Sequence, residues 1–234
     1  MADGVAGGQV PGRRGPSRAR TGIREPVNGL THIAGAAVAL AATVPLVLLT
    51  RGDRLDGAAS LVFGLTSVLA FVASSLLHSL WVAPARELWL RRFDHAAIFT
   101  LIAGTYTPIL VQALRPESPR LAWTVLAIVW TIAACGLVFK LLWIHAPRWL
   151  STALYLLMGW LVVGAIVPVA RALGPASVAW MAAGGLAYTV GAVIYGLKRP
   201  NLRPGFGFHE LWHVLVLVGW ACHAVMVYRV ALAA

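Results

Sequence analysis

The sequence predicts an all-α membrane protein, a bundle of seven transmembrane helices, from its composition, its apolar runs and the placement of its charges. Of its 234 residues, 59% are hydrophobic and only 12% are charged, whereas a typical soluble domain carries about 25% charged residues. The mean hydropathy is +0.79. The 10 tryptophans suit a chain with many helix ends at membrane interfaces.

Seven apolar runs of about 20 residues each are long enough to cross the hydrocarbon core as helices. The predicted helices span residues 29–49, 57–81, 96–114, 121–143, 150–170, 177–197 and 209–230. The connections between them are short and hold most of the charges. Residues 25–234 are therefore predicted to form one transmembrane domain.

The net charge of +11 reflects topology rather than binding of nucleic acid. Residues 1–24 are rich in Gly, Pro, Ser and Arg and predict a disordered basic tail, either a solvated cytoplasmic arm or a contact with anionic headgroups. No apolar segment typical of a cleavable signal peptide precedes the first run. Most of the 19 basic residues fall on the side of the N-terminus. This bias predicts a cytoplasmic N-terminus and an external C-terminus in a bacterial inner (plasma) membrane.

Polar residues from four helices are predicted to meet at one membrane level. His209 and His213 are four residues apart on one predicted helix, so their side chains lie on the same face. Their Cβ atoms would be about 6 Å apart. Alternating crossings bring His78 and Asp94 to the same level, with Ser74 one turn before His78. Three imidazoles with a nearby carboxylate have the composition of a catalytic zinc site, in which a fourth position holds water. Asp94 would orient that water, support a ligand from behind or act as a base.

Each of these residues also has a structural interpretation. His78 could be an interfacial side chain, and Asp94 could cap the third helix. Glu25 could belong to the first turn of the first helix.

His223, ten residues after His213, lies about 15 Å further along the helix and is predicted to make an inter-helix hydrogen bond instead. Lys140 lies within a run and would have to extend its charge to the interface.

Several motifs in order resemble the bacterial hemolysin III family, within the progestin and adipoQ receptor superfamily. They are Glu25-x2-Asn28-x3-His32, Ser74-x3-His78, Phe93-Asp94-His95, Gly104-Thr-Tyr-Thr-Pro108 and His209-Glu-Leu-Trp-His213. The resemblance spans residues 25–230. It implies a seven-helix bundle with Zn²⁺ near the cytoplasmic face.

The resemblance also implies residue roles. The zinc ligands would be His78, His209 and His213, with Asp94 holding a water and Ser74 near the metal. The residues of the first motif, Glu25, Asn28 and His32, would lie just behind the metal ligands. The superfamily also resembles alkaline ceramidases, which suggests hydrolysis of a lipid amide or ester.

Three functions remain open from the sequence. The first is a zinc-dependent intramembrane hydrolase whose partners are membrane lipids and a lipid-like substrate. The second is a sensor or receptor of membrane homeostasis that zinc stabilises without catalysis. The third is a cytolytic or pore-forming protein, which is physically weaker because the runs carry no polar stripe at mid-bilayer. The sequence predicts no oligomeric state.

Overall fold

The computed structural model describes residues 22–233, and in this part of the chain every named element is a helix. The elements are α1 (Pro26–Thr50), α2 (Arg54–Ser79), α3 (Pro84–Pro108), the π-helix η1 (Ile109–Leu114), α4 (Arg115–Glu117), α5 (Pro119–Leu142), α6 (Arg148–Gly159), the 3₁₀-helix η2 (Trp160–Ala165), α7 (Ile166–Leu197) and α8 (Phe208–Ala233). The all-α prediction is confirmed.

Six helical segments in the described residues are long and apolar enough to cross a membrane. One of them, Arg148–Leu197, has 50 residues and contains two of the predicted runs. A straight helix of that length would be about 75 Å long, more than twice the hydrocarbon thickness. Its backbone is broken at Gly174, where φ is 72°. The count of seven crossings stays a prediction.

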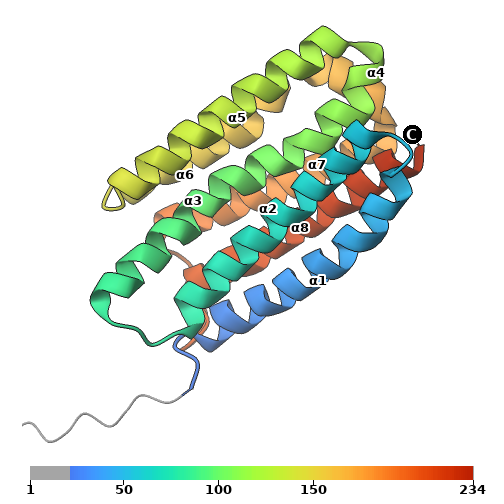
Figure 1. Ribbon diagram of the computed structural model, residues 1–234. Helices are drawn as coiled ribbons and strands as arrows, with labels where there is room; N and C mark the ends of the chain where they lie inside the picture. Colours follow the sequence, from blue (N-terminus) through green and yellow to red (C-terminus); the bar gives the residue numbers. More distant parts are fainter. Residues whose placement is uncertain (1–21, 234) are drawn as a thin grey trace, which may run out of the picture.

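The helices lie roughly parallel as one bundle, with α1 at one edge and α5 at the opposite edge (Figure 1). α2 packs between α1 and α3, and α8 contacts both α1 and α7. The start of α1 and the end of α8 lie at opposite ends of the bundle (Figure 1). The end of α2, the start of α1 and the start of α8 therefore share one end, and that end holds the predicted site.

The predicted start of the third helix is wrong by three turns. α3 begins at Pro84, with Pro at its first position and Glu87 in its first turn, and both favour a helix N-terminus. The charges that suggested a loop support this helix instead, because Glu87 and Arg91 form an i,i+4 ion pair of 3.0 Å. Asp94 therefore lies inside α3, and its interpretation as a helix cap is wrong, since the N-cap is Ala83.

The core follows α3, the most enclosed candidate span. Phe99 and Leu110 are both 1% exposed, and Phe99 packs where Gly136 of α5 leaves room for its ring. The outer helices expose large apolar side chains, such as Val44 and Leu48 of α1. In a membrane protein such faces contact lipid chains.

The predicted basic tail, residues 1–24, lies mostly outside the described residues. Its last residue within them, Arg24, is held rather than free. Its backbone N–H donates to the Ser79 carbonyl at 3.2 Å, and the next residue, Glu25, donates to the His78 carbonyl at 2.8 Å. These bonds fix the entry to α1 against the end of α2.

Candidate metal centre

Three histidines from two helices form a group that could hold a metal ion. They are His78, in the last turn of α2, and His209 and His213, in the first two turns of α8. One nitrogen from each lies within 4.8 Å of the other two. His78 and His213 are 5% and 3% exposed. The sequence prediction that these three side chains meet is confirmed.

The nitrogens are spaced as ligands of one ion would be. His209 Nε2 and His213 Nε2 are 3.1 Å apart. Two nitrogens bound to one tetrahedral ion at about 2.0–2.1 Å lie roughly 3.3 Å from each other. The His78 ring stands edge-on to both partners, with ring centroids 5.1 Å from His209 and 4.7 Å from His213. The donor set therefore fits one ion and leaves a fourth position.

Glu25 and Asn28 hold His78 from α1. His78 Nδ1 donates to Glu25 Oε2 at 2.6 Å, and Asn28 Nδ2 donates to the same oxygen at 3.0 Å. The hydrogen bond from His78 lowers the pKa of Glu25 to about 2, although partial burial opposes the shift. With Nδ1 occupied, Nε2 of His78 is the nitrogen left for a metal. A carboxylate behind a ligating histidine fixes the ring and makes it more basic.

His32 stands behind His213 in the same way. Its Nε2 lies 3.1 Å from His213 Nδ1, and the two rings are 4.2 Å apart between centroids. His32 is 5% exposed and meets the edge of Phe71. All three residues of the first motif, Glu25, Asn28 and His32, thus lie at the histidine group.

Asp94 and Ser74 line the same cavity as the three histidines, and neither belongs to the group that could hold the ion. The nearest charged partner of Asp94 is its neighbour on α3, since His95 Nδ1 lies 3.1 Å from Asp94 Oδ2. The Ser74 side chain is buried, with 4% of the residue exposed. The role of Asp94 as holder of a metal-bound water stays a prediction.

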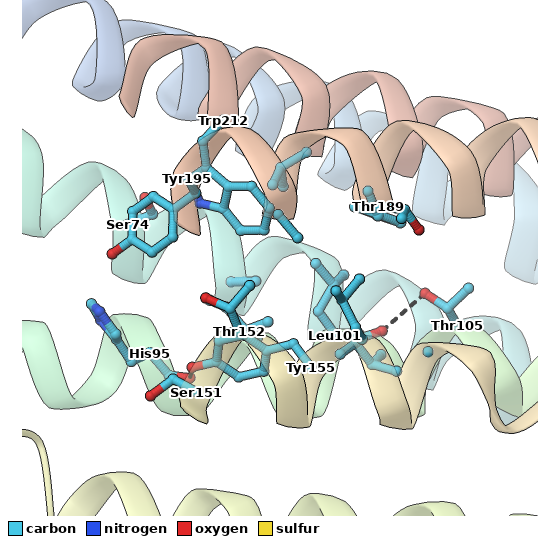
Figure 2. Close-up of a pocket in the computed structure, with 18 of the residues that line it drawn as sticks. Ser74, His95, Leu101, Thr105, Ser151, Thr152, Tyr155, Thr189, Tyr195 and Trp212 are labelled. Atoms are coloured by element: carbon cyan, nitrogen blue, oxygen red, sulfur yellow. Dashed lines mark hydrogen bonds between the residues drawn. The ribbon is translucent and has the colours of Figure 1, made fainter. Parts of the chain in front are cut away.

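A cavity of about 770 Å³ opens at the histidine group and continues between α3, α6 and α7. In Figure 2, Ser74, Tyr195 and Trp212 stand on one side of it, with His95, Ser151 and Tyr155 on the other. Further along, Leu101 and Thr105 line its wall, and the Thr105 hydroxyl donates to the Leu101 carbonyl at 2.9 Å (Figure 2). Most of the lining surface is apolar.

Comparisons of the sequence with known proteins identify the family of this chain. A model of the family described as "Haemolysin-III related" matches residues 21–224. This chain belongs to the haemolysin-III-related family. It is 36% identical to the "Hemolysin-3 homolog" of Bacillus subtilis (strain 168) over 202 residues, 85% of this chain and 91% of that protein. It is also 36% identical to "Hemolysin-3" of Bacillus cereus over 199 residues, 84% of this chain and 87% of that protein.

Family membership and the six candidate spans make this haemolysin-III-related chain a multi-pass bacterial membrane protein. The resemblance that the motifs predicted is therefore confirmed.

Sequence reasoning missed Glu210, which ties α8 to α1 in this haemolysin-III-related fold. Its Oε2 accepts from Gly207 N at 2.7 Å, and its Oε1 accepts from Asn28 Nδ2 at 3.3 Å. A glutamate three residues after a helix N-cap is the second half of a capping box, a signal that the sequence carried.

His223 is not a member of the three-histidine group, as predicted. Its Nε2 donates to the Met181 carbonyl of α7 at 3.1 Å. The predicted inter-helix hydrogen bond is confirmed.

Proposed function

We propose that this protein is a zinc-dependent hydrolase of a lipid-like amide or ester. One observation carries the proposal: three histidines arranged for one ion face a mostly apolar cavity that a carboxylate, Asp94, also lines. Structural zinc sites are usually closed by four protein ligands, whereas catalytic sites keep three and an open position. No fourth protein ligand joins the group among residues 22–233.

The donor set supports zinc as the metal. Imidazole suits Zn²⁺, and three neutral histidines leave the ion its full positive charge. When bound, zinc would lower the pKa of a coordinated water towards about 7 and polarise the substrate carbonyl.

The surrounding residues have distinct parts in this proposal. Asp94 holds the attacking water and accepts its proton, while Ser74 donates a hydrogen bond near the reacting carbonyl. Glu25 and Asn28 orient His78, and His32 orients His213. These contacts orient two of the three ligating rings, those of His78 and His213.

The cavity supports a lipid-like substrate. About 770 Å³ is within the usual size of a small-molecule site, and its mostly apolar wall suits a hydrocarbon chain. The polar end at the histidines would then receive the amide or ester bond.

The test is Asp94→Asn in the purified full-length protein. We expect zinc content and thermal stability to stay near wild type, while turnover of acyl amides falls by at least about 100-fold, as for loss of a general base. Glu117→Asn, an exposed carboxylate of α4, is the control and should change neither property. Equal turnover in Asp94→Asn and wild type would contradict the proposed role.

A second candidate is a zinc-stabilised sensor or receptor without catalysis. The contacts of Glu25 with His78 and of His32 with His213 favour it, because they join α1, α2 and α8 at the site. In that case His209→Ala would lower stability, and zinc-loaded wild type would hydrolyse no ceramide, acyl amide or phospholipid under conditions where a ceramidase does.

The names of the relatives, "Hemolysin-3 homolog" and "Hemolysin-3", raise a third candidate, a cytolytic or pore-forming protein. Release of an entrapped dye from liposomes that contain only lipid and this protein would favour it. Retention of the dye, together with acyl-amide turnover, would favour the hydrolase.

We also propose seven crossings, with the N-terminus cytoplasmic and the C-terminus outside. The opposite positions of the two helix ends support an odd number (Figure 1). Labelling of single cysteines placed in each connection, with a reagent that does not cross membranes, tests the orientation.

A further inference from the structure

Two cations that line the cavity have no acidic partner among residues 22–233, and the first is Lys140 of α5. It is 1% exposed, and its ammonium group donates to the Ser151 hydroxyl of α6. The expected extension of Lys140 to the interface is therefore wrong, because the side chain turns inward. Among residues 22–233, no carboxylate lies within ion-pair distance of it.

The second cation is Arg148, the first residue of α6. Its guanidinium carbon lies 4.6 Å from the centre of the Tyr195 ring and 5.7 Å from that of Phe208. Nη1 of Arg148 is buried and has no hydrogen-bond acceptor among the residues that the structure describes. In the described part of the chain, Arg148 also lacks an ion pair.

Shared neighbours connect the two cations with each other and with the histidine group. Ser151, the partner of Lys140, is three residues after Arg148 and so shares its helix face. The Tyr195 ring under Arg148 meets His209 edge-on, with ring centroids 5.8 Å apart. All these side chains line the same cavity, and Figure 2 shows Ser151 and Tyr195 facing it from opposite sides.

The other charged side chains near this end of the cavity already have partners. Arg24 pairs with Glu25 and Glu87, Arg91 pairs with Glu87, and Asp94 lies against His95. Lys140 is buried, and Arg148 is partly exposed with its Nη1 atom buried. A buried cationic group without a counter-charge is costly and marks a candidate functional site. Carboxylates and phosphates are the groups that Arg and Lys bind best.

We propose that the cavity binds an amphiphile whose anionic group, a carboxylate or a phosphate, pairs with Lys140 and Arg148 while its hydrocarbon chain fills the apolar part. This inference extends the proposed function. It rests on that function only where it identifies the bound amphiphile as the substrate. The substrate would then be an acyl amide or ester with an acidic headgroup, and the scissile bond would lie between the chain and that headgroup.

The test compares two acyl amides that differ in headgroup charge. N-oleoylglycine is anionic, N-oleoylethanolamine is neutral, and both carry the same chain. Binding to the purified full-length protein in a neutral detergent is measured by native mass spectrometry. We expect wild type to prefer N-oleoylglycine by at least tenfold. Lys140→Met and Arg148→Gln should each reduce that preference to threefold or less.

Control variants show whether the charges of Lys140 and Arg148 set the preference. Arg120→Gln, an exposed cation at the other end of α5, should keep the preference. Lys140→Arg, which retains the charge, should keep it too, even if Lys140→Met folds poorly. His209→Ala should also keep it. If only His209→Ala abolishes it, the carboxylate binds at the metal position and the inference is wrong.

The source of the anion is distinguished with inorganic phosphate. If millimolar phosphate displaces N-oleoylglycine from wild type but not from Lys140→Met, Lys140 and Arg148 form an anion site. In that case a small free anion is enough to occupy the site. Absence of displacement, with the headgroup preference intact, supports an amphiphile. Equal affinity of wild type for the two amides overturns the inference. Selective binding of N-oleoylglycine without hydrolysis, with zinc bound, would contradict the hydrolase and leave the inference standing.

Discussion

Glu25 Oε2 and His78 Nδ1 lie 2.6 Å apart, although 53 residues separate them in the chain. This contact joins the residue before α1 to the last turn of α2, and it fixes which nitrogen of His78 faces the other histidines. A histidine ligand held in this way has a defined ring orientation before any metal arrives.

The first prediction follows from that contact. Glu25→Gln should weaken zinc binding by about 10- to 100-fold, because a neutral amide holds and polarises the imidazole less well than a carboxylate. Titration against a competing chelator measures the change. Glu117→Gln is the matched control, and equal zinc affinity in Glu25→Gln and wild type would show that the carboxylate has no part in the site.

His223 provides a second prediction. His223→Phe should leave the zinc content unchanged, since its nitrogen is used by the Met181 carbonyl. It should lower the free energy of unfolding by about 1 kcal/mol, the usual net value of one hydrogen bond. Metal analysis and denaturant titration check the two parts. A loss of zinc in this variant would place His223 at the metal site and contradict the assignment.

Close packing of α3 against α5 leads to a third prediction. A β-carbon at Gly136 would overlap the ring of Phe99, which is 1% exposed. Gly136→Leu should therefore destabilise the protein by roughly 1–3 kcal/mol or more, the usual cost of overpacking a core. Gly196→Leu is the control, because nothing lies within 4 Å of a β-carbon there. If both variants unfold at the same temperature, the packing argument fails.

The fourth prediction concerns acid stability at the other end of the bundle. The Asp53 side chain accepts from the backbone N–H groups of Asp56 and Leu55 at the start of α2 and pairs with Arg115. Those two N–H groups, followed by Arg115, lower the pKa of Asp53. Since the folded pKa lies below the unfolded one, the stabilisation is present above about pH 4 and is lost as the pH falls through the folded pKa.

Asp53→Ala should accordingly melt at a lower temperature than wild type at pH 6, and the gap should narrow as the pH falls to about 3. Thermal unfolding followed by circular dichroism gives both curves. If the difference in melting temperature between wild type and Asp53→Ala stays constant from pH 6 to pH 3, the ionised Asp53 carboxylate is not its cause.

The sequence predicted the histidine group because its signal is local. The spacing of His209 and His213 gives one helix face, and counting crossings brings His78 to the same end. The pairing of Glu25 with His78 could not be predicted in this way, because it depends on the axial position of α1 relative to α2. The same limit applies to Lys140, whose inward direction depends on where Ser151 of α6 comes to lie.

The helix boundaries show a second limit. The density of charge in Arg86–Arg92 predicts a connection, but the i,i+4 spacing of Glu87 and Arg91 supports a helix. The predicted connection between residues 170 and 177 contains the backbone break at Gly174, but the chain is helical on both sides of that one residue. Hydropathy locates the part of a helix within lipid, while capping and ion-pair spacing decide where the helix starts.

The central claim is that His78, His209 and His213 hold one zinc ion together. Elemental analysis of purified wild type and His209→Ala tests it most directly, with His223→Phe as the matched histidine control. We predict close to one zinc per chain in wild type and His223→Phe, and a small fraction of that in His209→Ala. Wild type without zinc after purification in its presence, or equal zinc in wild type and His209→Ala, would contradict the claim.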